Sequence, residues 1–136
     1  NFSCLEEKIQ SLVCQKPTAI EVLEAITKIF PNQKGIPQNT KSACKRLCLF
    51  LRWMIRKNSE VDFGIWNILQ EKDLIIPLDT HVFRISKQLS LTNRKQADML
   101  SAIQITEKLK ITFPDDPLLG DYALFGYGVK HQEKTK

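Results

Sequence analysis

The chain has 136 residues, and its 20 lysines and arginines against 15 aspartates and glutamates give a net charge of +5. This length suits one domain with a substantial core, and 43% apolar with 26% charged residues is ordinary globular composition that argues against disorder. The longest apolar run, 47–51, is far shorter than the ~20 residues that span a bilayer. We therefore expect a soluble, cytoplasmic protein without a membrane partner.

Apolar residues recur at three- and four-residue intervals, and alternating strand patterns are absent, so we predict an all-α fold. The first helix spans about 5–16 and ends before Pro17, which disfavours helical geometry in the preceding residue. A second helix begins after Thr18, whose hydroxyl caps it with Glu21 as the capping-box partner. Pro31 stops this helix.

A loop at 31–40 precedes a long helix that is capped by Thr40 or Ser42 and runs to about Arg56. One side of this helix is apolar and the opposite side is basic. The segment 41–57 contains six basic residues and no acidic one, namely Lys41, Lys45, Arg46, Arg52, Arg56 and Lys57. Such a segment is typical of a phosphate-binding surface, although a solvated helix face is the alternative.

The second half of the chain predicts four more helices. A short helix over 63–70 is followed by an apolar stretch at 74–78 and by a helix that Asp79 opens. Two further helices lie near 95–112 and 116–129. Together these elements predict a helical bundle.

We expect a single helical domain over 1–136, with 130–136 as a frayed tail. The four cysteines are interpreted as reduced thiols, because nothing else indicates secretion. Cys44 and Cys48 have helical spacing among apolar neighbours, which favours two packed thiols over a metal site. No metal and no cofactor are expected.

Asp79 is the most informative single residue. The apolar run 74–78 delivers one carboxylate to a helix N-terminus, and Pro77 fixes the direction of approach. As N-cap, Asp79 accepts hydrogen bonds from the first turn and gains from the positive end of the helix dipole, which favours its ionised form. A capping role alone is the alternative interpretation.

The run Pro77–Arg84, Pro-Leu-Asp-Thr-His-Val-Phe-Arg, resembles the helix start that bears the catalytic aspartate in the helix-hairpin-helix DNA glycosylase superfamily, of the endonuclease III and adenine glycosylase kind. Three wider stretches, 42–56, 61–66 and 121–128, resemble an uncharacterised bacterial family distantly related to those glycosylases. The likeness covers residues 36–129. It implies a helical bundle of the glycosylase fold, and because that family is longer at its N-terminus, it implies that N-terminal helices are missing here.

The resemblance also implies a role for Asp79, whose ionised carboxylate would stabilise positive charge on the deoxyribose, or orient the attacking water, while a flipped base leaves. The residues expected to contact DNA phosphates are Lys41, Lys45, Arg46, Arg52, Arg84 and Lys87. The superfamily hairpin reads Leu-Pro-Gly-Val-Gly before a basic residue, whereas 36–43 here lacks both glycines, so we expect a degenerate hairpin. The Schiff-base lysine of bifunctional members would fall at Ser42, so lyase activity is not expected, with Lys41 and Lys45 as conceivable substitutes.

The resulting hypothesis is a DNA-binding base-excision repair protein, a monofunctional DNA N-glycosylase with Asp79 as its catalytic residue. Two alternatives stay open: a non-enzymatic nucleic-acid-binding module and a helical protein-interaction domain. We assign Trp53 and Trp66 to the core, and His81 to an exposed first helical turn. The aspartates at 115, 116 and 121 are interpreted as helix N-terminal charges.

Overall fold

The computed structural model describes residues 2–133 and contains six α-helices and one 3-10 turn. These are α1 (Phe2–Leu12), α2 (Ala19–Ile29), α3 (Lys45–Ile55), η1 (Glu71–Asp73), α4 (Thr80–Gln88), α5 (Met99–Thr112) and α6 (Leu118–Glu133). No strand is assigned over 2–133, and the only β-type pairing described there is an isolated antiparallel bridge between Ser42 and Asp98. The all-α prediction is confirmed.

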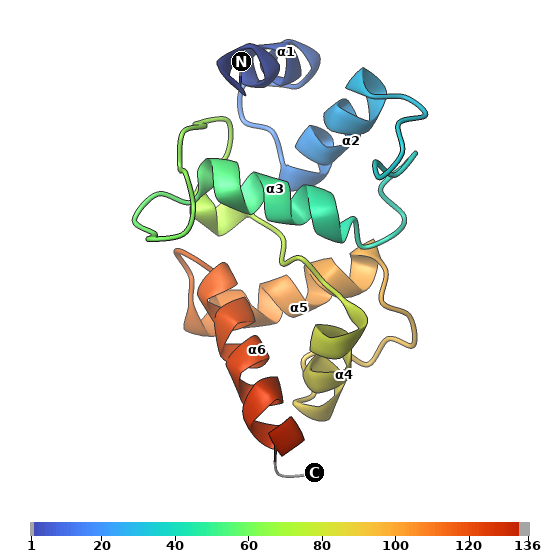
Figure 1. Cartoon of the computed structure of the whole chain (residues 1–136), viewed down its shortest axis with the longest axis vertical. Coiled ribbons are helices and arrows are strands. Elements are labelled where there is room, and N and C mark those ends of the chain that lie inside the picture. The colour runs from blue at the N-terminus through green and yellow to red at the C-terminus, as the bar shows by residue number, and fades with distance from the viewer. Residues whose placement is uncertain (1, 134–136) are drawn as a thin grey trace.

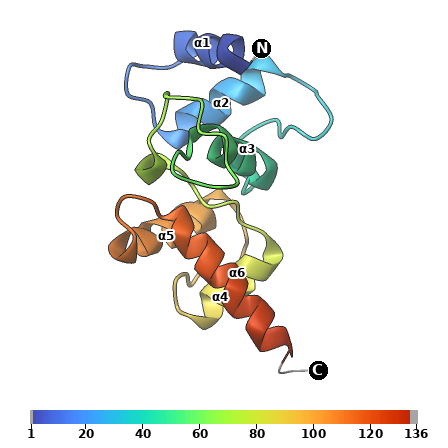
Figure 2. The ribbon, with the colours of Figure 1, turned by 60° about the vertical axis from the view of Figure 1, so that its left-hand side comes forward.

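The helices form two groups joined by one extended segment (Figure 1). α1, α2 and α3 lie at one end of the molecule, whereas α4, α5 and α6 lie at the other. The segment 74–79 passes from the first group to the second beside α3. The two ends of the chain therefore lie at opposite ends of the molecule, as Figure 2 also shows.

A single cluster of buried apolar side chains joins both groups. It draws on α2 and α3, on the 74–78 segment, and on α4, α5 and α6. Thr18 caps α2 as predicted, and its hydroxyl accepts from the Glu21 N–H at 3.3 Å. Trp66 is fully buried and contacts Phe50 edge to face at 5.3 Å, which confirms its assignment to the core.

The predicted helix over 63–70 is wrong, because this segment is an irregular connection that runs back along the end of α3. The amides of Phe63 and Gly64 both donate to the Trp53 carbonyl, at 2.8 and 3.0 Å, and the Trp66 amide donates to Met54. Gly64 has φ +59°, where a Cβ would lie 2.6 Å from the Arg56 carbonyl, so the local turn requires glycine. These bonds to α3 take the place of helical ones.

Several element boundaries also differ from expectation. α1 ends at Leu12, and the N-cap of α3 is Cys44, with φ 49° and no side-chain cap, where Thr40 or Ser42 had the better capping chemistry. Trp53 is exposed, in contrast to its assignment to the core. α6 continues to Glu133, and 134–136 of the predicted tail lie outside the described residues.

All four cysteines are free, and Cys44 and Cys48 are buried as predicted. Burial raises the pKa of the Cys48 thiol to about 12, so this group stays protonated. Over the described part of the chain, none of the helices combines the length and apolar character needed to cross a bilayer.

Candidate functional site

Asp79 lies where the two groups of helices meet. Its Oδ1 accepts from the Val82 N–H at 2.8 Å and caps α4, as predicted. Its Oδ2 accepts from Lys45 Nζ at 3.0 Å. The Asp79 side chain is 35% exposed and that of Lys45 47% exposed, so solvent reaches both groups. The site thus pairs an accessible carboxylate on α4 with an ammonium from the first turn of α3.

The apolar run before Asp79 explains this placement. Residues 74–78 are buried in the core, and the Ile76 amide donates to Thr106 Oγ1 of α5 at 3.1 Å. The backbone leaves the core at Leu78, so the next side chain emerges at the surface as the N-cap of α4. Burial of the run therefore fixes the position of the carboxylate.

The pKa of the Asp79 carboxyl lies below its usual value. Partial burial acts in the opposite direction, but the Val82 N–H and the Lys45 ammonium together outweigh it, with a smaller contribution from His81. Asp79 is therefore ionised at neutral pH. Its charge is matched by the ammonium of Lys45.

The basic side of α3 is partly internal. Arg56 is buried and its guanidinium contacts Asp62 at 2.9 Å and Asp116 at 2.8 Å. Arg52 Nε lies 3.4 Å from the same Asp62, whose side chain is fully buried. Both guanidinium carbons lie over the Tyr122 ring, at 5.2 and 5.3 Å from its centroid. These arginines tie the end of α3 to the 57–70 connection and to the start of α6.

The residues predicted to contact phosphate thus fall into two classes. Arg52 is 14% exposed and engaged with Asp62, so it occupies a structural ion pair. The exposed members are Lys41, Lys45, Arg46, Arg84 and Lys87. Of these, Lys45 contacts Asp79, and on α4 Arg84 lies 3.4 Å from His81 Nδ1 while Lys87 lies over the Phe83 ring.

Asp121, in the first turn of α6, was not recognised as a site residue from the sequence. Its side chain is buried, its Oδ1 has no hydrogen-bond partner within the described chain, and it interacts electrostatically with Arg52, Asp79 and Lys45. The interpretation as a helix N-terminal charge is confirmed for this residue, which lies in the first turn of α6, but its burial was not foreseen. One signal was present: Asp121 follows Leu118 and precedes Leu124 at three-residue intervals, on the buried stripe of its own helix.

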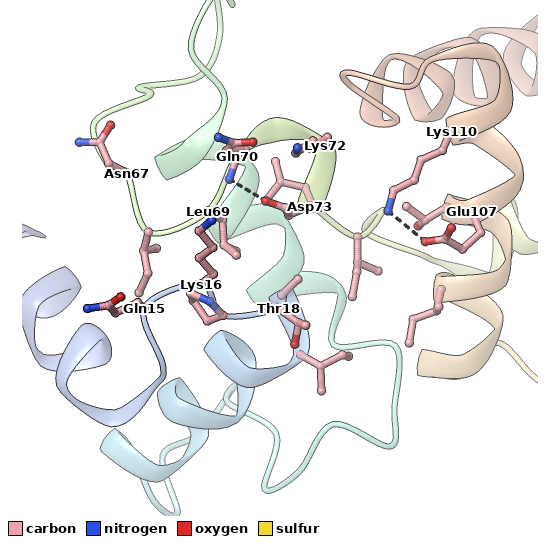
Figure 3. A pocket seen from close by; sticks show the side chains of 18 residues that line it. Gln15, Lys16, Thr18, Asn67, Leu69, Gln70, Lys72, Asp73, Glu107 and Lys110 are labelled. Carbon is pink, nitrogen blue, oxygen red and sulfur yellow. Dashed lines mark hydrogen bonds and ion pairs between the residues drawn. The ribbon is translucent and has the colours of Figure 1, made fainter.

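A hollow of about 690 Å³ lies elsewhere, between the start of α2, the segment 67–75 and α5 (Figure 3). Its rim is polar, with Lys16 and Lys72 on two sides and Lys110 paired to Glu107 at 2.9 Å. Neither Asp79 nor Lys45 lines it. The Asp79 carboxylate is therefore a surface group, outside this hollow.

Comparison with curated proteins and with solved structures gave no match. A comparison with protein families matched residues 3–130 to a family described as a protein of unknown function, DUF2400. The match includes the Asp79 helix start, the basic side of α3 and the first turns of α6. The chain belongs to the DUF2400 family.

Proposed function

We propose that this chain is a DNA-binding protein of the base-excision kind, in which Asp79 assists departure of a damaged base. The observation that carries the proposal is the Asp79 carboxylate itself. One of its oxygens is fixed by the α4 amide at 2.8 Å and the other meets the Lys45 ammonium at 3.0 Å, while a third of the side chain is open to solvent. This combination gives a fixed, ionised and accessible carboxylate.

In the proposed reaction, the bond between C1′ of the deoxyribose and the base nitrogen breaks, and its electron pair leaves with the base. Positive charge develops on the sugar ring, which the nearby Asp79 carboxylate stabilises. Water then adds to C1′ and releases a proton. The damaged nucleotide must leave the base stack to reach a surface carboxylate, and the resemblance of Pro77–Arg84 to the glycosylase helix start supports this assignment.

The test is an abasic-site assay on duplexes that carry deaminated, oxidised or alkylated bases. Asp79→Asn removes the charge but keeps a good N-cap, so the fold of α4 is retained. Asp98→Asn is the matched control, because Asp98 caps α5 through the Ser101 amide at 2.9 Å and pairs with Arg94 at 2.7 Å. We expect alkali-labile sites with the wild type and with Asp98→Asn, and at least a hundredfold fewer with Asp79→Asn. Equal product from both variants, or none from the wild type on any duplex, refutes the enzymatic proposal.

DNA binding can be measured separately from base release, through the dependence of the affinity on salt concentration. Five exposed cations, Lys41, Lys45, Arg46, Arg84 and Lys87, limit the number of phosphates that can be neutralised near the site. The slope of log affinity against log salt concentration should then be no steeper than about −4.5. Salt-dependent binding that persists without base release would favour a non-enzymatic binding module. Absence of binding at low salt would instead favour a protein-interaction domain.

The Lys45–Asp79 contact also favours a second candidate activity, strand cleavage at an abasic site. Here the Lys45 ammonium first gives up a proton to solvent, and the free amine attacks C1′ of the ring-opened sugar and loses water to form an imine. Removal of a C2′ proton then expels the 3′ phosphate with the electron pair of the C3′–O bond. Borohydride reduction traps the imine as a covalent protein–DNA adduct. An adduct that is lost in Lys45→Met and kept in Lys41→Met supports the lyase step, and no adduct with the wild type excludes it.

A further inference from the structure

The hollow of about 690 Å³ takes no part in the proposed base-excision reaction. Its walls come from three parts of the chain: the connection into α2 at 15–20, the segment 67–75, and the side of α5 within 103–110 (Figure 3). Small-molecule sites in proteins have volumes of roughly 300–1,000 Å³. The hollow is therefore a candidate binding site, separate from Asp79.

Two walls of the hollow are held in place by hydrogen bonds to the rest of the fold. Glu6 of α1 accepts from the Ile68 amide at 2.9 Å, which fixes the start of the segment 67–75. The Ile76 amide donates to the Thr106 hydroxyl at 3.1 Å, which joins the end of that segment to α5. The hollow is thus formed without a ligand, and a preformed site lowers the entropic cost of binding.

The inner surface of the hollow is apolar. Leu69, Leu74 and Ile75 are at most 9% exposed, Ile103 of α5 is half-buried, and all four line the hollow. Such a surface suits a planar or aliphatic part of a ligand.

The rim of the hollow is cationic. Each wall contributes one lysine: Lys16 before α2, Lys72 in η1 and Lys110 on α5 (Figure 3). Of the two carboxylates in the lining, Glu107 contacts Lys110 at 2.9 Å, and Asp73 accepts from a backbone amide at 3.1 Å. Within residues 2–133, no carboxylate forms an ion pair with Lys16 or Lys72. Two ammonium groups are therefore left to bind an anion, for which phosphate is a suitable partner.

Carboxamide side chains complete the lining, at Gln15, Asn67 and Gln70. A carboxamide both donates and accepts hydrogen bonds, so it can pair with the polar edge of a nucleobase. A ligand that matches all of these groups carries a phosphate, a planar ring and hydrogen-bonding edges. Nucleotides combine the three.

We propose that the hollow is a nucleotide-binding site, in which Lys16 and Lys72 hold the phosphate and the apolar inner surface carries the base. The proposal does not depend on base excision, because neither Asp79 nor Lys45 lines the hollow. Two sources supply this chemistry, a free nucleotide and a nucleotide at the unpaired end of a DNA strand. Binding measurements separate them.

The first measurement titrates adenosine monophosphate, adenosine and ribose 5-phosphate into the isotope-labelled full chain and follows the amide chemical shifts. We expect saturable shifts with adenosine monophosphate at 15–20, 67–75 and 103–110. Adenosine lacks the phosphate and should bind at least about tenfold more weakly, since a contact between ammonium and phosphate is charge-assisted. Ribose 5-phosphate keeps the phosphate and lacks the base, and should also bind more weakly. The proposal is overturned if the three stretches show no saturable shift, or if either fragment binds as tightly as the nucleotide.

The second measurement uses charge-removing variants. Lys16→Gln and Lys72→Gln should each weaken binding of adenosine monophosphate at least about fivefold. Lys108→Gln is the matched control, because Lys108 is exposed on α5 and does not line the hollow, and it should keep the wild-type affinity. Equal losses in all three variants would show a general charge effect and would refute the site.

The same variants identify the source of the nucleotide. A duplex with an unpaired, phosphorylated end that competes with adenosine monophosphate, and that loses affinity in Lys16→Gln but not in Lys108→Gln, assigns the hollow to a DNA strand. Duplex affinity that is equal in both variants assigns it to a free nucleotide. Asp79→Asn should bind adenosine monophosphate as the wild type does, so failure of the nucleotide site and failure of base excision are observed separately.

Discussion

Removal of Asp62 should destabilise the protein more than removal of any acidic partner on the surface. The Asp62 side chain is fully buried and contacts Arg56 at 2.9 Å, Arg52 at 3.4 Å and the Ser59 hydroxyl at 2.9 Å. Asp62→Ala leaves two largely buried guanidiniums short of a counter-charge, a change that costs about 3–5 kcal/mol. Arg56 keeps Asp116 at 2.8 Å, so we expect a loss at the lower end, about 3 kcal/mol.

Urea unfolding followed by tryptophan fluorescence and by far-ultraviolet circular dichroism measures this loss. Asp62→Asn removes the same counter-charge but keeps an oxygen for the Ser59 hydroxyl, so it should lose only about 1 kcal/mol less than Asp62→Ala. Glu107→Ala removes an exposed partner of Lys110, 2.9 Å away in the same helix, and should change stability by less than about 0.5 kcal/mol. If Asp62→Ala loses no more than Glu107→Ala, the arginines on this side of α3 are not held by internal ion pairs, and the assignment of Arg52 to a structural role fails.

Three further outcomes follow from the same contacts. At Gly128, an added Cβ would lie 2.3 Å from an α4 side chain, so Gly128→Ala should cost about 1–3 kcal/mol in urea unfolding, whereas Gly126→Ala meets no atom within 4 Å and should be neutral or stabilising. Arg94 lowers the pKa of Asp98 from 3.8 to about 2, so the stability that ionised Asp98 contributes is present above pH 3.8 and is lost as pH falls through 2. The difference in free energy of unfolding between wild type and Asp98→Asn should therefore shrink over that range, and a constant difference would contradict this. Burial raises the pKa of Asp121 from 3.8 to about 6, so its ionisation destabilises the fold progressively from pH 3.8 to 6. Asp121→Asn should therefore have a free energy of unfolding up to about 3 kcal/mol higher than the wild type above pH 6, and an equal one near pH 3. An equal gain at both pH values would show that charge is not the cause.

The sequence predicted best those features that depend on neighbouring residues. Thr18 and Asp79 were identified as N-caps because capping needs only a short polar side chain and the amides of the next turn. The connection at 63–70 was wrongly predicted to be a helix. Its structure is determined instead by amide bonds to the carbonyls of α3 and by the positive φ of Gly64. Such long-range partners leave no periodic signal.

Which basic residues are paired with acids also depends on long-range contacts, so the sequence does not predict it. The count of six basic residues over 41–57 treats them as equivalent, but Arg56 is neutralised by Asp62 and by Asp116, which lies 60 residues away in the chain. Arg52 meets the same Asp62. Net charge is additive along a sequence, whereas pairing depends on which acids the fold brings near. A basic run therefore bounds the number of phosphate contacts without identifying them.

The two aspartate caps of this chain show why Asp79 stands apart from an ordinary cap. Asp98 and Arg94 are four residues apart, so their pair forms from local sequence alone. Lys45 comes from 34 residues before Asp79, and the contact exists only because the 74–78 run is threaded through the core beside α3. A capping role requires the Val82 amide and no cation. The distant Lys45 ammonium is a polar partner that capping does not need, and our proposal of chemistry at Asp79, beyond capping alone, starts from this contact.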